Sequence, residues 1–213
     1  MSRRLKTDMP GSDWRLDPEL LRSRGIAACF EALPRPLRLV VEIGFGRGEF
    51  LCELAKAEPA TAFLGIEYSH KRVLKLARRL ARTDLVNLRL LELPAEVALA
   101  ELLPAAGVSE FWINFPDPWP KKRHHRRRLI QPAIVSQLRA CLVPGGGLHV
   151  ATDHPGYAEA IDLCLAAEPG FENAFAPAPF RREVPGHTPT AYELEWRALG
   201  RPLHFFEFRR RAG

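Results

Sequence analysis

Alternating apolar and amphipathic segments constrain the fold of this chain more than any other feature of its sequence. We expect strands at 37–45, 61–68, 87–93, 110–115 and 147–152, with a helix after each of the first three. In the helix after the second strand, Val73, Leu76, Ala77 and Leu80 share one face, as the core side of a helix requires. Strands that alternate with helices predict an α/β fold whose parallel sheet is covered on both faces.

The other segments complete one domain. Two later strands, at 171–175 and 203–208, have no obvious helix between them and predict a hairpin beside the sheet. Pro132 is tolerated only in the first turn of a helix, so we expect 117–130 to be a long loop after the fourth strand. Residues 1–25 are polar and are expected to form a basic, flexible arm, and 26–213 the folded domain.

The charge balance favours a polyanionic partner. The 213 residues carry a formal net charge of +6, and basic side chains are concentrated at 121–128. Four scattered cysteines without a C-x-x-C pair favour a reducing compartment over a disulfide framework or a metal site. Because no signal segment or run of about 20 apolar residues is present, we expect a cytoplasmic protein without a membrane span. The sequence does not distinguish a monomer from a homodimer.

A glycine-rich turn joins the first strand to its helix. The segment Glu42-Ile-Gly44-Phe-Gly46-Arg-Gly48 has the spacing G-x-G-x-G, whereas a nicotinamide fingerprint requires a third glycine where Glu49 stands. Glu42 and Glu49 would repel a diphosphate but suit the ammonium or sulfonium of S-adenosylmethionine. Backbone N–H groups at the start of the helix are suited to the carboxylate of the same ligand.

Glu67 ends the second strand, where an acidic side chain can accept hydrogen bonds from both hydroxyls of a ribose. Together with the glycine loop, it predicts a pocket for S-adenosylmethionine. Three alternatives stay open: a tight turn without a ligand, a nicotinamide-dependent oxidoreductase with the same sheet, and a Glu67 that simply ends its strand in solvent.

The segment Phe115-Pro-Asp117-Pro-Trp119-Pro-Lys121-Lys-Arg-His124 follows the fourth strand. Its three prolines stiffen the chain and hold Asp117 and Trp119 in place. An aromatic ring beside a carboxylate suits a nucleobase, because the ring can stack and the acid can accept N–H groups from guanine. The basic run that follows would contact phosphates. The segment therefore indicates a nucleic-acid substrate.

These two motifs resemble those of the bacterial tRNA (guanine-N7-)-methyltransferase family. The similarity continues through Ala151-Thr-Asp153, Thr190-Ala-Tyr-Glu193 and Ala198-Leu-Gly-Arg-Pro202, and spans about residues 38–208. It implies a Rossmann-like class I S-adenosylmethionine-dependent methyltransferase, with a mostly parallel seven-stranded sheet and a reversed last strand. The implied reaction is methyl transfer to N7 of a guanine in the variable loop of tRNA.

The resemblance also implies roles for individual residues. It implies donor binding by Glu42, Gly44, Gly46, Gly48, Glu67, Pro94 and Ala95, substrate binding by Lys121, His124, Arg127, Asp153, Thr190 and Glu193, and a catalytic role for Asp117. Position 94 departs from the family, which usually has an acid or amide there to recognise adenine. Proline cannot make that side-chain contact, although the Ala95 N–H remains available.

Several of these residues also suit structural roles. Asp117 could cap the proline turn, Asp153 could start a helix, and Thr190 with Glu193 has the spacing of a capping box. The basic run could be a solvated loop, and a non-catalytic RNA-binding protein would keep it as well. Guanine N7 carries a lone pair and no proton, so the transfer requires no general base. We therefore expect Asp117 to orient guanine and to stabilise it as it becomes cationic.

Overall fold

The computed structural model describes residues 14–212 of the chain. The strands are β1 Leu39–Ile43, β2 Ala62–Ile66, β3 Leu88–Leu91, β4 Val108–Asn114, β5 Leu142–Thr152, β6 Phe171–Asn173 and β7 His204–Arg210. The α-helices are α1 Pro18–Arg24, α2 Glu49–Ala57, α3 His70–Leu80, α4 Ala95–Glu101, α5 Pro132–Cys141, α6 Pro155–Ala166 and α7 Ala191–Ala198. Two 3₁₀ helices, η1 Ile26–Phe30 and η2 Lys122–Arg127, complete the described elements.

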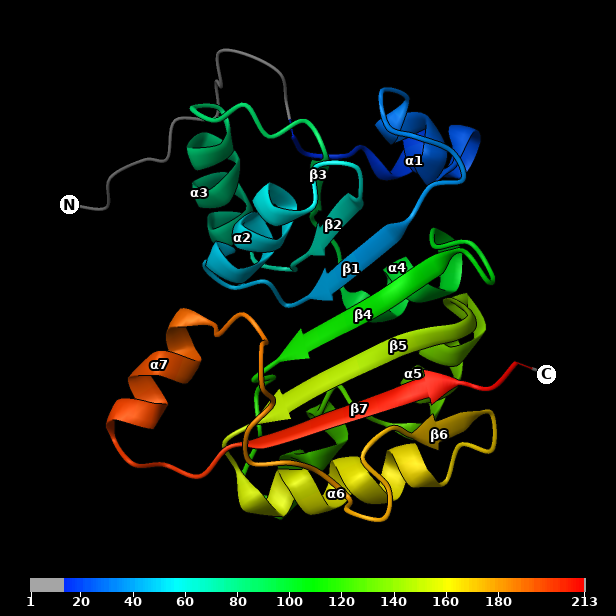
Figure 1. The fold of residues 1–213 in the computed structure, drawn as a ribbon. Coiled ribbons are helices and arrows are strands. Elements are labelled where there is room, and N and C mark those ends of the chain that lie inside the picture. Colours follow the sequence, from blue (N-terminus) through cyan, green and yellow to red (C-terminus); the bar gives the residue numbers. More distant parts are fainter. Residues whose placement is uncertain (1–13, 213) are drawn as a thin grey trace.

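The described strands form one seven-stranded sheet in the order β3-β2-β1-β4-β5-β7-β6. The first five strands in this order are parallel to one another, and β7 runs antiparallel between β5 and β6. In Figure 1 the arrowheads of β1, β4 and β5 point toward α7, whereas β7 points the opposite way. This confirms the predicted fold class, including the reversed last strand.

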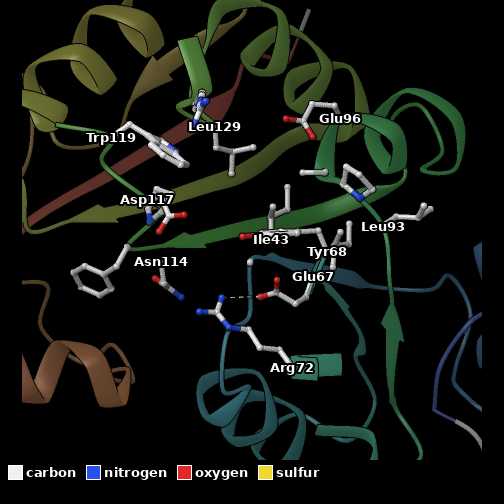
Figure 2. Close-up of a pocket in the computed structure, with 17 residues that line it drawn as sticks. Ile43, Glu67, Tyr68, Arg72, Leu93, Glu96, Asn114, Asp117, Trp119 and Leu129 are labelled. Atoms are coloured by element: carbon white, nitrogen blue, oxygen red, sulfur yellow. Dashed lines mark hydrogen bonds and ion pairs between the residues drawn. The ribbon is translucent and has the colours of Figure 1, made fainter. Parts of the chain in front are cut away.

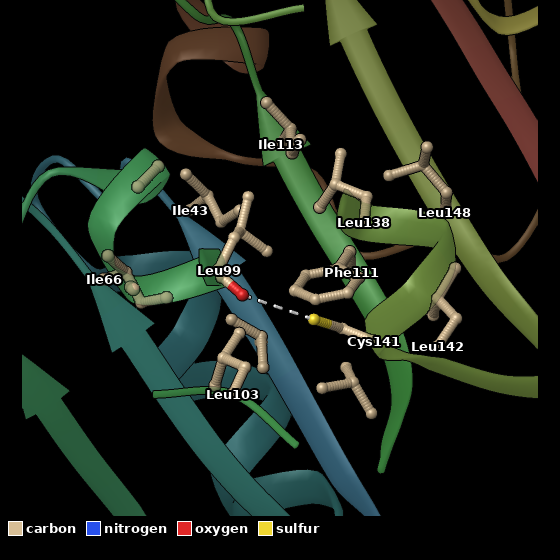
Figure 3. Packing of buried hydrophobic residues seen from close by; sticks show 14 of the residues in the cluster. Ile43, Ile66, Leu99, Leu103, Phe111, Ile113, Leu138, Cys141, Leu142 and Leu148 are labelled. Carbon is tan, nitrogen blue, oxygen red and sulfur yellow. Dashed lines mark hydrogen bonds between the residues drawn. The ribbon is translucent and has the colours of Figure 1, made fainter. Parts of the chain in front are cut away.

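The pleat of β1 divides the core into two layers. Val41 packs in one apolar cluster with α4, α5 and α6, whereas its neighbour Val40 packs in a second cluster with α2 and α3. In the first cluster Phe111 of β4 lies among Leu99, Leu138 and Leu148 (Figure 3). Helices on both faces leave the carboxyl ends of the parallel strands free, which is where such sheets bind ligands.

The beginning of the described chain packs on the sheet. Trp14 is buried and its Nε1 donates to the Leu85 carbonyl at 3.0 Å, while Leu90 exchanges backbone hydrogen bonds with the segment at 14–16. The helix α1 follows, capped by the Asp17 side chain. Of the predicted flexible arm, residues 1–13 lie outside the described residues, and 14–25 are part of the folded domain.

Two details differ from the sequence prediction. The strands β6 and β7 are antiparallel neighbours, but the connection between them contains the helix α7. The loop at 117–130 contains the six-residue 3₁₀ helix η2, and α5 then begins at Pro132, as the proline requires. None of the helices that the structure describes is long and apolar enough to cross a membrane.

Candidate active site

Two adjoining cavities open at the carboxyl ends of β1, β2, β4 and β5. One has a volume of about 390 Å³ and reaches from Glu67 to Trp119, and the other has about 630 Å³ and reaches from the glycine loop to α7. Residues that line both cavities are Gly44, Arg72, Asn114, Phe115 and Asp117. The two cavities therefore form one site, divided by the ends of β1 and β4.

The glycine loop has the backbone conformation that its sequence predicts. Gly44, Gly46 and Gly48 have backbone φ angles of 75°, 56° and 71°, which residues other than glycine adopt only with steric strain. A Cβ at Gly48 would also lie 2.3 Å from a methyl carbon of Leu76 on α3. Small size and positive φ together place the loop close to α3 and open the space above it.

Glu67 is buried and organises the loop from the end of β2. Its carboxylate accepts hydrogen bonds from the backbone N–H of Gly46 at 3.2 Å and of Ser69 at 3.0 Å, and from Arg72 Nη1 at 3.3 Å. The close-up in Figure 2 shows Glu67 and Arg72 on one side of the 390 Å³ cavity and Asp117 and Trp119 on the other. Glu67, which was predicted to contact a ribose, thus lines the wall of the smaller cavity.

Glu42 is a second buried acid, on β1. Its Oε1 accepts a hydrogen bond from Asn114 Nδ2 at 3.2 Å, whereas its Oε2 is buried without a partner among the described residues. Burial raises the pKa of Glu42 to about 8, against the hydrogen bond from Asn114, and the nearby Glu67 adds to the rise. Glu42 also lines the larger cavity, and an acid with one unpartnered oxygen is suited to a cationic ligand group.

The segment at 93–96 forms another part of the wall of the smaller cavity. Pro94 is the N-cap residue of α4, and its side chain makes no hydrogen bond to the helix. Ala95 begins the helix, so its N–H is one of the donors without a partner inside the helix. Leu93, Pro94, Ala95 and Glu96 line this cavity together with Ile43 and Ile66. The wall is therefore largely apolar, which suits an aromatic ring.

The segment after β4 carries unusual backbone angles. Phe115 and Trp119 have φ of 51° and 41°, and the prolines between them fix the chain on both sides of Asp117. The Phe115 N–H donates to the Ala151 carbonyl at 2.9 Å, which anchors the segment to β5. Asp117 is exposed and faces both cavities, so a constrained backbone presents a charged group to the site.

The basic loop packs around Trp119. The Arg127 guanidinium lies 5.0 Å from the centre of the Trp119 ring, and His124 contacts the ring edge-on at 5.8 Å. Arg128 is buried instead, and its Nε donates to the Pro118 carbonyl at 2.8 Å. Of the predicted loop residues Arg127 lines the smaller cavity, whereas Lys121 is exposed and, like His124, lies beside the cavities without lining them.

The far wall of the larger cavity comes from β5 and α7. Asp153 follows β5, and Thr190 caps α7 by accepting a hydrogen bond from the Glu193 N–H at 3.0 Å; both line the cavity. Glu193 lines neither cavity. Its buried carboxylate accepts hydrogen bonds from His187 Nε2 at 2.9 Å and Arg197 Nε at 2.8 Å, so this side chain is not part of the cavity wall that Asp153 and Thr190 form.

Among the residues that line the site and were absent from the sequence prediction, three make contacts with functional side chains or with the proline segment. Asn114 orients Glu42, Arg72 contacts Glu67, and the ring of Tyr192 on α7 packs at a tilt against that of Phe115, with 4.8 Å between the ring centres. Asn114 immediately precedes the proline segment, and this position was the only feature of the sequence that could have indicated a role in the site. Arg72 lies among several other basic residues of α3 and had no feature that distinguished it.

Comparisons with known proteins agree with this geometry. A family model described as a putative methyltransferase matches residues 37–206. A tRNA (guanine-N(7)-)-methyltransferase of Halorhodospira halophila is 38% identical over 188 residues, which are 88% of this chain and 81% of that protein. The protein of the same name from Thiobacillus denitrificans is 39% identical over 197 residues, 91% of this chain and 82% of its own length.

Solved structures support the fold alone, because their sequences are distant. The 16S rRNA methyltransferase KamB has a TM-score of 0.64 at 18% identity and covers 88% of this chain and 93% of its own. A mutant 16S rRNA (adenine(1408)-N(1))-methyltransferase from Catenulisporales acidiphilia, crystallised with its cosubstrate SAM, has a TM-score of 0.60 at 20% identity over 92% of this chain and 91% of its own. With the family model and the curated relatives, the match is decisive: this chain belongs to the tRNA (guanine-N(7)-)-methyltransferase family.

Proposed function

We propose that this protein transfers a methyl group from S-adenosylmethionine to N7 of a guanine in tRNA, in the cytoplasm. The observation that carries the proposal is the junction of the two cavities at Asn114, Phe115 and Asp117. A buried acid lines each cavity, Glu42 the larger and Glu67 the smaller, while the Asp117 carboxylate stands at the junction beside an aromatic ring and a basic loop. By resemblance to the family, the target is the guanine in the variable loop.

The residues of the donor side fit S-adenosylmethionine. The unpartnered Oε2 of Glu42 is suited to the ammonium group, and Glu67 is placed to accept hydrogen bonds from the ribose hydroxyls. The glycine loop lets the ligand approach the backbone closely. The wall at Pro94 and Ala95 is assigned to adenine, with the Ala95 N–H as a donor. The bound donor supplies an electrophilic methyl group on a sulfonium.

The substrate side needs no proton acceptor, because guanine N7 attacks through a lone pair. Trp119 is placed to stack on the base, while Asp117 is placed to accept hydrogen bonds from its N–H groups. Guanine becomes cationic as the bond to N7 forms, so the negative charge of Asp117 stabilises it more after transfer than before. Asp117 therefore acts by orientation and charge.

The other assigned residues surround the base. Arg127 holds the Trp119 ring in place and can reach a phosphate, while Lys121 and His124 extend the cationic surface outward. Asp153 and Thr190 form the wall opposite the glycine loop and are assigned to the nucleotide. The burial of the Glu193 side chain, which belongs to α7, supports a role in holding that wall.

The test is incubation of the protein with unmodified tRNA and labelled S-adenosylmethionine, followed by identification of the methylated nucleoside. Formation of 7-methylguanosine supports the proposal, and a label in another nucleoside or in none contradicts it. Two alternative functions predict different results with the same protein and tRNA. An oxidoreductase would bind a nicotinamide dinucleotide in place of the methyl donor, and a non-catalytic RNA-binding protein would bind tRNA without incorporating label.

A further inference from the structure

The exposed side of α3 is a positive surface separate from the loop at 121–128. The segment from Ser69 to Thr83 contains six Lys and Arg residues and no Asp or Glu. Its apolar residues face the core, and so the cations are directed outward. We use the term α3 basic face for Lys71, Lys75, Arg78 and Arg82.

The α3 basic face forms a groove that continues from the candidate active site. The groove has a volume of about 460 Å³, and its lining residues are Lys71, Lys75, Arg78, Arg79, Arg82 and Thr83. Two of them, Lys71 and Lys75, also line the larger cavity of the site. In Figure 1 both α3 and α7 lie at the left of the view, and β1, β4 and β5 point toward α7. A chain bound at the site could thus extend along α3 without leaving a positive surface.

The cations of this face are not neutralised by the protein. Among the described residues, none of Lys71, Lys75, Arg78 and Arg82 forms an ion pair, and Nη2 of Arg78 is buried without a hydrogen-bond acceptor. Two neighbours have structural contacts instead: Arg72 contacts Glu67, and Arg79 donates to the Gly48 carbonyl at 3.0 Å. Unpaired donors beside a site for a polyanion favour an anionic ligand over a solvated surface.

We propose that the α3 basic face binds the phosphate backbone of the tRNA at a segment outside the nucleotide that reacts. This inference rests on the proposed function, since tRNA is the polyanion that the site would hold. From Lys71 to Leu80, the end of α3, the helical rise gives about 13 Å, and Arg82 lies beyond that end, so the cations extend too far for one phosphate group and far enough for more than one along a strand. The cations lie in a row instead of converging on one point, as binding of a backbone requires.

The test compares two variants with equal charge change. The double variant Arg78→Gln/Arg82→Gln removes two cations of the groove that line neither cavity of the site. The control Arg24→Gln/Arg209→Gln removes two exposed cations at the end of α1 and in β7. Affinity for unmodified tRNA is measured over a range of salt concentrations, together with S-adenosylmethionine affinity and the thermal midpoint.

We expect the Arg78/Arg82 variant to lose about 0.7–0.9 units of log–log salt slope per lost phosphate contact, so about 1.4–1.8 units in all. The control should keep the wild-type slope, and both variants should keep their S-adenosylmethionine affinity and thermal midpoint. An unchanged slope in the Arg78/Arg82 variant, or an equal loss in the control, would overturn the inference. If wild-type protein fails to produce 7-methylguanosine, the proposed function fails, whereas the salt slopes still report separately on the α3 basic face.

Discussion

The Glu67 carboxylate accepts a hydrogen bond from the Gly46 N–H at 3.2 Å, across 21 positions of the chain. A second hydrogen bond, from the Ser69 N–H, joins the same carboxylate to the start of α3. One buried acid therefore connects the end of β2, the glycine loop and α3. The shape of the donor pocket and its proposed contact with ribose depend on the same side chain.

Replacing Glu67 should weaken the donor complex. We expect Glu67→Ala to reduce the free energy of S-adenosylmethionine binding by about 1–3 kcal/mol, the range for a lost hydrogen bond to a charged group. Calorimetry measures the change. Glu92→Ala is a matched control, because Glu92 pairs with His70 near the end of β3 and lines neither cavity. Equal affinity of wild type and Glu67→Ala would remove Glu67 from the donor site.

Glu42 should make the stability of the ligand-free protein depend on pH. Its pKa of about 8 in the folded protein exceeds the ordinary value of 4.5, so between these values the folded state holds a proton that the unfolded chain has lost. Wild-type stability should then fall as pH rises from about 5 to 8, by up to about 1.4 kcal/mol per pH unit from this group.

The variant Glu42→Gln has no carboxyl group that titrates at this position. The difference between its thermal midpoint and that of wild type should therefore rise over the same pH range and level off above pH 8. Melting curves of both proteins at each pH provide the comparison. A difference that stays constant with pH would mean that Glu42 is ionised in the folded protein.

Pro94 should be dispensable for donor binding. The side chain of Pro94 makes no capping hydrogen bond to α4, and we assign adenine recognition to the Ala95 N–H. Pro94→Asp should therefore bind S-adenosylmethionine equally or more tightly, and the new carboxylate should stabilise α4 by about 0.5–1 kcal/mol as an N-cap. Pro94→Ala separates the loss of the ring from the gain of the acid. Weaker binding by both variants would show that the proline ring itself is needed.

Periodicity predicted the elements whose apolar face is regular. The strand β1 is apolar except for Glu42 and is buried along its whole length, and in the helix α3 Val73, Leu76 and Leu80 are buried as predicted. The helix α7 has the opposite pattern, because Glu193 is buried while Leu194 is 54% exposed. A charged residue on the inner face conceals the helix from any argument based on apolar spacing, so the sequence predicted no helix between the last two strands.

The candidate site was predictable where one short segment carries the chemistry, as at Gly44 or Asp117. It was not predictable where a contact joins residues that are far apart in the sequence. Asn114 reaches Glu42 because β4 lies beside β1 with Glu42 next to Trp112, a register that the sequence does not contain. Trp14 is similar, since its burial depends on a partner at Leu85 and not on its neighbours in the chain.

Glu193 should contribute to stability more than to tRNA binding. Burial opposes its ionisation, but hydrogen bonds from His187 and Arg197 outweigh burial and lower the pKa of Glu193. The stabilisation is therefore present above the ordinary carboxyl pKa and is lost as pH falls below it. We expect Glu193→Ala to lower the free energy of unfolding at pH 7 by about 1–3 kcal/mol.

Urea denaturation measures this loss, and tRNA affinity is measured well below the thermal midpoint. Unchanged stability with weakened tRNA binding would return Glu193 to the substrate-binding role that the family resemblance implies.

Asp117 should affect the rate of methyl transfer far more than folding. It is exposed, and the prolines on both sides together with the Phe115–Ala151 hydrogen bond hold the segment independently of its charge. Asp117→Asn keeps the size of the side chain and removes the negative charge. If that charge stabilises a guanine that is cationic only during and after transfer, the rate should fall by about 10²–10³-fold, as for other preorganised electrostatic groups.

Single-turnover methylation at saturating tRNA and donor measures this rate without contributions from binding. The affinity for tRNA should change little, because phosphate contacts dominate it, and the thermal midpoint should stay near that of wild type. Asp153→Asn is a matched control on the opposite wall of the larger cavity, and we expect a smaller effect on the rate there. A near-normal rate for Asp117→Asn would mean that the carboxylate does not act on the reacting guanine, and that the positions of Trp119 and the donor account for catalysis on their own.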